Sequence, residues 1–194
     1  MDQNQPPTPS DLERIEDGVS GKFQNFRQAT VRHFQIRIDR EGAWHYLGSP
    51  IMRTQLVKLF STVLCREEDG RYWLVTPAER GLIDVDDVPF LAVEVNRIPG
   101  ENADGSDDIL RFRTNLDAEI ECDKNHPIRV EIDQLTKEPR PYIVVRDALE
   151  ARLTRAVFYE LADLAQERVI HGDKVFGVWS KGIFHPLGSA EIDL

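Results

Sequence analysis

The sequence predicts an α+β fold of two small, similar domains, each an antiparallel sheet packed with one amphipathic helix. Three observations predict it. Short β-rich segments separated by turn residues occupy much of the chain. Two stretches carry apolar residues at helical spacing. The acidic, proline-bearing segment of residues 85–90 is typical of a linker. Because the order is strands, helix, many strands, helix and hairpin, a doubly wound parallel sheet is disfavoured.

The first domain is predicted over residues 23–87. Apolar and polar residues alternate through residues 34–38, which predicts a half-buried strand with a return strand after it. Residues 50–64 then carry apolar side chains at helical spacing and predict one amphipathic helix. Turns near Gly70 and Gly81 bound the strand that follows.

The second domain is predicted over residues 88–194, and residues 1–22 are expected to form a polar leader with a short helix. Five short β-rich segments separated by Gly, Asp, Asn or Pro predict an antiparallel meander. A stripe of apolar residues over 149–165 predicts the second amphipathic helix. A final hairpin is expected to turn at residues 180–182.

Two heptapeptides, "GAWHYLG" at residues 42–48 and "GIFHPLG" at residues 182–188, share glycine, an aromatic residue, histidine, leucine and glycine at the same offsets. The first precedes the first predicted helix, whereas the second follows the second helix. A simple tandem copy therefore cannot align both the heptapeptides and the helices. The pattern leaves open whether the two heptapeptides form a true repeat.

The overall charge excludes some classes of partner. The formal net charge is −10, so the average surface repels nucleic-acid phosphates and anionic membranes, and neither is an expected partner. The chain has no signal-peptide pattern and no apolar run of about 18 residues, which predicts a cytoplasmic protein. Its two cysteines, Cys65 and Cys122, lack the spacing of a zinc site and are expected to be free thiols.

No motif for a reaction is present. The nucleophile elbow, the phosphate-binding loop, the zinc-protease helix and the dinucleotide fingerprint are all absent. The five histidines show no metal-ligand spacing. Residues 100–108 place oxygen-bearing side chains at alternate positions but lack the glycine and the glutamate of a calcium loop, so a solvated hairpin loop is expected. We therefore assign no catalytic residue, metal or cofactor.

One stretch of the first domain combines groups that can orient a polar ligand. In "YWLVTPAERG" an aromatic pair precedes a hydroxyl, a carboxylate and a guanidinium within one turn. Trp73 and Thr76 are the candidate ligand contacts. The alternative is that Trp73 fills the core and Thr76 starts a turn.

Arginines supply the candidate charges. Arg113 and Asn115 share one face of a predicted strand, and a guanidinium fork suits phosphate or carboxylate. Arg53 and Arg155 stand near the starts of the two predicted helices, where a positive charge opposes the helix dipole. In so acidic a chain, these arginines can instead form salt bridges to aspartate and glutamate.

Most of the chain after residue 30 resembles the bacterial family called domain of unknown function 1285. The resemblance is carried by "GAWHYLGSPIMRTQLVKLFSTVL", "DGRYWLVTPAERGLIDVDDVPF", "LRFRTNLDAEI", "VRDALEARLTRAVFYELADLA" and "FGVWSKGIFHPLG". It implies two similar domains, the second somewhat like a pleckstrin-homology barrel, with a ligand site between them. It further implies a nucleotide-like ligand and a role in signalling, in a family without an established activity.

We expect a non-enzymatic protein that binds a small anionic, nucleotide-like ligand between its two domains. The alternative is a protein-interaction module, in which a sheet face or a strand edge docks a partner. An enzyme acting on a phosphorylated small molecule would lack a nucleophile–base pair. The oligomeric state is left open. The residues expected to bind the ligand are Trp44, His45, Arg53, Trp73, Thr76, Arg113, Asn115 and Arg155.

Overall fold

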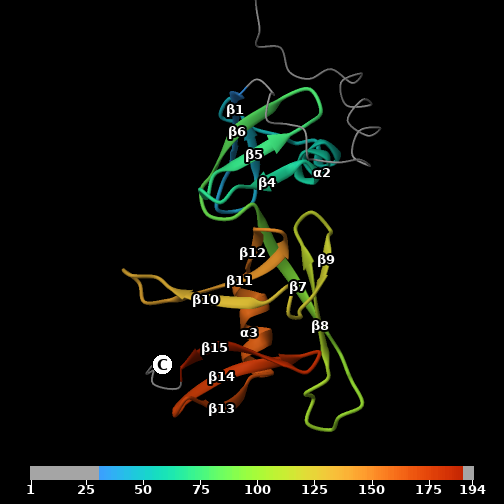
Figure 1. Cartoon of the computed structure of the whole chain (residues 1–194), viewed down its shortest axis with the longest axis vertical. Helices are drawn as coiled ribbons and strands as arrows, with labels where there is room; N and C mark the ends of the chain where they lie inside the picture. The colour runs from blue at the N-terminus through green and yellow to red at the C-terminus, as the bar shows by residue number, and fades with distance from the viewer. Residues whose placement is uncertain (1–30, 190–194) are drawn as a thin grey trace, which may run out of the picture. The chain divides into compact units, whose positions relative to one another are not determined.

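The protein divides into two compact units in a computed structural model, of which residues 31–189 are described (Figure 1). Within that range, the first unit comprises residues 31–37 and 44–84, and the second comprises residues 38–43 and 85–189. The predicted leader lies outside the described residues. Each unit combines sheet with one helix, so the predicted α+β class is confirmed. None of the described helices is long and apolar enough to cross a membrane.

The first unit is a six-stranded sheet with one short helix. The helix α2 (Thr54–Thr62) connects the third and fourth strands. In spatial order, the strands run β3-β2-β1-β6-β5-β4. Their bounds are β1 (Val31–Ile38), β2 (Trp44–Tyr46), β3 (Ser49–Pro50), β4 (Leu64–Arg66), β5 (Tyr72–Val75) and β6 (Arg80–Val85).

The helix of the first unit packs through an aromatic contact. The Phe60 ring of α2 stacks on Trp44 of β2, with 6.2 Å between ring centroids. Val57 on the same helix is buried. The helix is shorter than the predicted 50–64, since Pro50 belongs to β3 and the helix runs only from Thr54 to Thr62. The turn predicted near Gly81 is wrong: Gly81 lies within β6, and the chain turns earlier, where Thr76 N–H donates to Glu79 O.

The second unit contains a six-stranded sheet, a helix and a three-stranded sheet. The helix α3 (Arg155–Asp163) separates the two sheets in the chain. The larger sheet has the order β10-β11-β12-β7-β8-β9, and the smaller has the order β13-β14-β15. The strands are β7 (Phe90–Ile98), β8 (Ile109–Thr114), β9 (Glu119–Glu121), β10 (Ile128–Ile132), β11 (Pro139–Arg146), β12 (Leu149–Leu153), β13 (Gln166–Ile170), β14 (Asp173–Ser180) and β15 (Ile183–Ser189).

One pair of strands departs from the predicted antiparallel meander. β7 and β12 pair in parallel, with Ala151 opposite Phe90. On their other sides, β12 pairs with β11 and β7 pairs with β8, and both of these pairs are antiparallel. The parallel pair therefore joins two meanders into one sheet.

The second helix begins later than predicted. Leu149 and Leu153 were expected on its apolar stripe but lie on β12, where Leu149, Ala151 and Leu153 are buried. Residues four positions apart share one face of a helix and also one face of a strand. Their spacing alone therefore cannot distinguish the two structures, which is why this segment was predicted as helix. The helix starts after Thr154, whose side-chain oxygen accepts a hydrogen bond from Val157 N–H.

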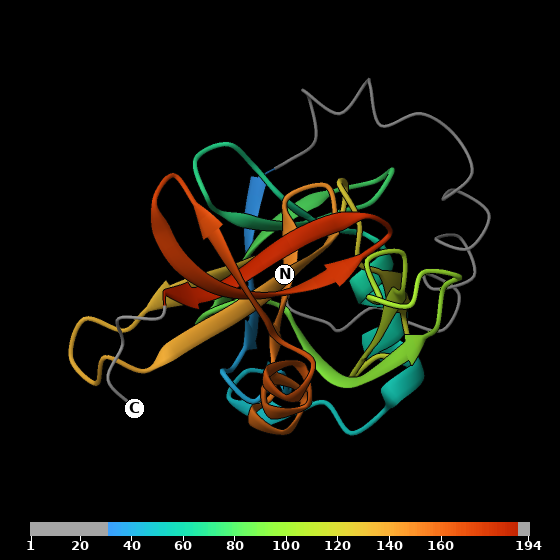
Figure 2. The ribbon, with the colours of Figure 1, turned by 90° about the horizontal axis from the view of Figure 1, so that it is seen from below.

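The three-stranded sheet packs against the six-stranded sheet through one buried face. That face carries Val178, Ser180, His185 and Leu187. The Ser180 hydroxyl donates to Cys122 O at 2.7 Å and accepts from the backbone N–H of Leu110 at 3.0 Å. Figure 2 shows α3 nearly end-on beside these strands. Hydrogen bonds and apolar contacts together fix the smaller sheet on the larger one.

The two heptapeptides of the sequence have different structures. In the first, a short strand ends at a turn where Leu47 has a φ of 49° and is exposed. In the second, the corresponding Leu187 is buried within the continuous strand β15. The histidines differ as well, since His45 is half-buried and His185 is 3% exposed. The matched residues therefore do not form a structural repeat.

Candidate functional site

The two tryptophans predicted to contact a ligand lie in the core of the first unit. Trp44 is 2% exposed and Trp73 is 3% exposed. The guanidinium carbons of Arg80 and Arg71 lie 3.9 and 5.4 Å from the centroid of the Trp73 ring. This is the core alternative that the sequence allowed for Trp73.

The other candidates of the first unit lie on separate elements. The Thr76 hydroxyl donates to Glu79 O and accepts from Glu79 N–H, so it closes the turn before β6. His45 is half-buried on β2. Arg53 precedes α2 and makes no side-chain cap on that helix. Thr76 thus has the turn role that was the alternative to ligand binding.

The two candidate arginines of the second unit form salt bridges. Arg113 Nε and Nη2 donate to one oxygen of Glu94 at 2.8 and 2.6 Å, and Nη1 donates to Asp117 at 3.3 Å. The hydrogen bond to Glu94 raises the pKa of Arg113. Arg155 Nη2 donates to Glu138 at 2.9 Å on the exposed surface. Both arginines therefore form salt bridges, which was the alternative to ligand binding in the sequence analysis.

Asn115 fastens the segment of residues 38–43 to β7. Its side-chain oxygen accepts from Leu91 N–H at 3.1 Å, and its side-chain nitrogen donates to Gly42 O at 3.4 Å. Gly42 has a φ of +74°, and a Cβ there would lie 2.7 Å from the Asn115 nitrogen. The close approach therefore requires glycine. Both polar groups of the Asn115 side chain are therefore hydrogen-bonded within the protein.

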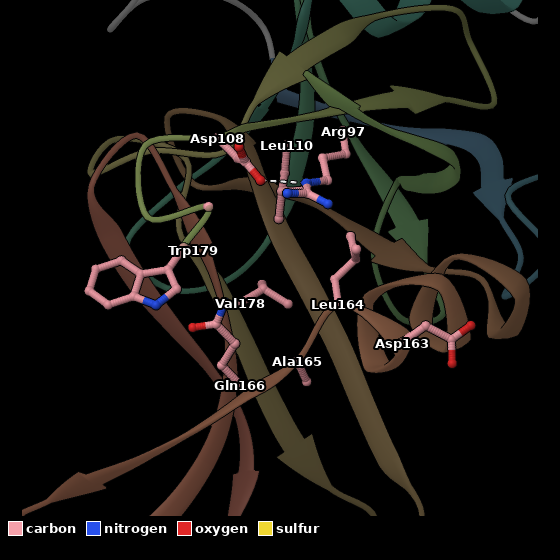
Figure 3. Close-up of a pocket in the computed structure, with 10 residues that line it drawn as sticks. Arg97, Asp108, Leu110, Asp163, Leu164, Ala165, Gln166, Val178 and Trp179 are labelled. Atoms are coloured by element: carbon pink, nitrogen blue, oxygen red, sulfur yellow. Dashed lines mark hydrogen bonds and ion pairs between the residues drawn. The ribbon is translucent and has the colours of Figure 1, made fainter. Parts of the chain in front are cut away.

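The second unit contains a cavity of about 300 Å³, which we call the C-terminal pocket (Figure 3). It lies where α3 ends and β13 begins. None of the eight predicted ligand residues lines it. The lining residues that matter for its chemistry are Arg97, Asp108, Leu110, Leu164, Gln166 and Trp179.

The pocket arises because β13 is shorter than its neighbour β14. The pairing of these strands stops at Gln166 and Gly177, so Val178 and Trp179 extend past the start of β13. The end of α3 forms the wall beside them. The loop before β8 is held nearby, because Lys181 N–H donates to Asp108 O at 2.7 Å. Three elements thus meet around one hollow.

The polar wall of the pocket is an ion pair. Asp108 is 7% exposed, accepts the Gly100 N–H at 2.8 Å and also accepts from Arg97 Nε. The Gly100 hydrogen bond is the main cause that lowers the pKa of Asp108, and Arg97 adds to it. Both oxygens of Asp108 are therefore engaged, whereas the terminal nitrogens of Arg97 remain on a side chain that is 47% exposed.

Two further polar groups border the pocket. The Gln166 side-chain nitrogen donates a hydrogen bond to Asp104 O at 2.9 Å. The amide oxygen of the same side chain is a hydrogen-bond acceptor that this contact does not use. The carboxylate of Asp163 points away from the other labelled polar groups in Figure 3. The lining of the pocket therefore combines N–H donors from Arg97 and one amide oxygen with the apolar side chains of Leu110 and Leu164.

The sequence did not single out Arg97, Gln166 or Trp179. The expected hairpin loop at residues 100–108 and the expected final hairpin both form, but their contact with each other is tertiary. In the loop, Asp107 accepts from the N–H groups of Glu101 and Asn102. Among residues 31–189, no group of three His, Cys, Asp or Glu side chains is arranged to hold a metal ion.

The fold and the pocket define a two-domain α+β protein with a small cavity in its second unit. Two family models match the chain: the N-terminal domain of unknown function DUF1285 over residues 25–88, and the C-terminal domain of the protein of unknown function DUF1285 over residues 89–187. The chain belongs to the DUF1285 family, which confirms the resemblance found in the sequence.

Solved structures of the same family are similar to this chain. A DUF1285 protein from Silicibacter pomeroyi DSS-3 is 36% identical, with a TM-score of 0.76 over 97% of this chain and 91% of that one. A DUF1285 protein from Shewanella baltica OS155 is 25% identical, with a TM-score of 0.51 over 67% of this chain and 91% of that one. No curated protein matches. These comparisons support the family and the fold.

Proposed function

We propose that this protein binds a small organic molecule in the C-terminal pocket. The observation that carries the proposal is the cavity of about 300 Å³, whose lining combines apolar side chains with a few polar groups. Ligand sites in proteins are concave, mostly apolar and oriented by few polar groups, with volumes from about 300 Å³ upward. The proposal keeps the class of function predicted from the sequence, small-molecule binding, and moves the site to the second unit.

The polar wall favours a ligand that accepts hydrogen bonds. Because Asp108 already accepts from Arg97 and from Gly100, its charge is compensated within the protein. The terminal N–H groups of Arg97 are the donors left to a ligand oxygen. Leu110 and Leu164 would contact the apolar part of the same molecule. An aromatic or heterocyclic compound with an oxygen acceptor matches this mixed lining.

The test is ligand binding in a variant whose pocket is filled. Ala165 lines the pocket, so Ala165→Phe places a ring in the cavity. Ala162 lies one turn earlier, is exposed and does not line the pocket, so Ala162→Phe is the matched control. Wild type and both variants are screened by thermal shift against nucleotides and small aromatic acids.

A compound that binds only the folded state stabilises it by about 2.7 kcal/mol at a hundredfold excess over its Kd. We expect hits for wild type and Ala162→Phe and none for Ala165→Phe. Equal shifts in all three proteins would contradict binding in this pocket. The signalling role and the cytoplasmic location predicted from the sequence stay predictions, and both are compatible with a ligand-binding protein.

A further inference from the structure

An arginine on the three-stranded sheet stacks on two aromatic rings next to the C-terminal pocket. Val178 and His185 point into the core, and alternation along β14 and β15 places Trp179 and Phe184 on the opposite face. The two rings pack edge to face, with 5.4 Å between centroids. The guanidinium carbon of Arg168 on β13 lies 4.9 Å from the Trp179 centroid and 5.5 Å from the Phe184 centroid.

Glycine at position 177 allows this stack to lie close to the sheet. A Cβ at Gly177 would lie 2.6 Å from the Cζ of Phe184 and 2.5 Å from the carbonyl oxygen of His185. No side chain can occupy that space while the Phe184 ring covers the strand. The ring therefore rests directly on the backbone of β14, and the platform under the guanidinium is held in place.

No carboxylate among residues 31–189 forms an ion pair with Arg168. Arg111, Arg113 and Arg129 on the neighbouring sheet each pair with a carboxylate. Within residues 31–189, the only contacts found for the exposed Arg168 guanidinium are the two rings. A guanidinium stacked on a ring keeps its in-plane N–H groups free for a carboxylate or phosphate fork.

The stack and the pocket share residues. Trp179 lines the pocket and carries Arg168 on its ring. Gln166 lines the pocket too, and it lies two positions before Arg168 on β13, so both side chains project from the same face of the sheet. Arg168 therefore lies beside two of the residues that line the pocket.

We propose that Arg168 binds the anionic group, a phosphate or a carboxylate, of the molecule whose remaining part occupies the C-terminal pocket. This inference rests on the proposed function. It places the recognition of the anion on Arg168, because Arg113 and Arg155 are already paired with carboxylates.

The experiment compares Arg168→Gln with Lys174→Gln. Both variants remove one positive charge from the β13–β14 hairpin. Lys174 forms an ion pair with Glu167. Because Glu167 is next to Arg168 on β13, its side chain projects from the opposite face of the sheet. Phenyl phosphate and benzoate are the anionic probes, phenol is the neutral one, and calorimetry measures the Kd. We expect both anions to bind wild type and Lys174→Gln about tenfold or more tighter than Arg168→Gln, as for a charge-assisted hydrogen bond. Phenol should bind all three proteins equally.

The outcomes separate this inference from the proposed function. Loss of phenyl phosphate binding in Ala165→Phe with full binding in Arg168→Gln would support the pocket and overturn the role of Arg168. Loss in Arg168→Gln with full binding in Ala165→Phe would support the anion site and overturn the pocket. If neither anion binds wild type at about 10 mM, a concentration that detects even a millimolar Kd, the role of Arg168 is overturned. A preference for phenyl phosphate over benzoate would identify the anion as a phosphate.

Discussion

The imidazole Nδ1 of His185 accepts a hydrogen bond from the backbone N–H of Ile128 at 3.5 Å, where β15 packs against β10. Because Nδ1 is an acceptor, the proton of the neutral ring is on Nε2. Nε2 is buried and has no hydrogen-bond partner within the described residues. A second proton would have to displace the Ile128 hydrogen bond and charge a buried ring, so this contact favours the neutral form.

The first prediction is a loss of stability in mild acid that depends on His185. Burial lowers the pKa of His185 below its usual 6.5, against a smaller opposing effect of Asp123. The unfolded chain therefore binds this proton at a higher pH than the folded chain does. Stability is fully present above about pH 6.5 and falls as the pH drops below it toward the folded pKa.

The measurement is the free energy of unfolding in urea at about pH 7.5 and about pH 5.5, on the two sides of the histidine titration. His185→Asn keeps an acceptor close to Ile128 and cannot titrate, so its stability should change less between the two pH values. An identical change in both proteins would show that His185 does not contribute to the acid sensitivity.

The second prediction concerns the buried hydroxyl of Ser180. Ser180→Ala would leave Leu110 N–H and Cys122 O without their partner inside the packing between the two sheets. We expect the free energy of unfolding to fall by about 2 kcal/mol or more, because each unsatisfied buried group costs about 1–3 kcal/mol. The control is Ser49→Ala at an exposed serine, which should have almost no effect. Equal effects of the two substitutions would contradict the bridging role.

The third prediction is that the two thiols react at very different rates. Cys122 is fully buried, and burial raises its pKa to about 12, whereas Cys65 is half-buried. The thiolate is the reactive species, so Cys122 should be inert at neutral pH in the folded protein. A colorimetric thiol assay should titrate at most one group in native protein and two in denaturant. A Cys65→Ser variant that still reacts rapidly when folded would disprove this.

The fourth prediction separates Arg113 from the anion site. Arg113 pairs with Glu94 and Asp117 on a partly exposed surface and does not line the pocket. Arg113→Ala should therefore leave the affinity for phenyl phosphate unchanged and alter stability little, since exposed ion pairs contribute little. Calorimetry under the conditions used for Arg168→Gln gives the comparison. A loss of affinity as large as that of Arg168→Gln would restore the site predicted from the sequence.

Elements with local signals could be predicted from the sequence. The amphipathic helix around Val57 and the final hairpin form as predicted, because spacing and turn residues within a few positions favour them. Local signals fail where one spacing fits two structures. Leu149 and Leu153 are four residues apart, which suits a helix, and only the pairing of β12 with β7 and β11 makes that segment a strand.

The candidate site depends on contacts between distant parts of the chain. The C-terminal pocket joins Arg97 on β7 with Gln166 and Trp179 on the β13–β14 hairpin, which lies about 70 residues further along the chain. The same holds for the arginines. Arg113 is paired because Glu94 lies opposite it on the adjacent strand, whereas Arg168 on the edge strand β13 meets two aromatic rings and no carboxylate among residues 31–189. Which carboxylate meets which guanidinium depends on strand register, and register is set by the burial of one sheet face, which no short stretch of sequence contains.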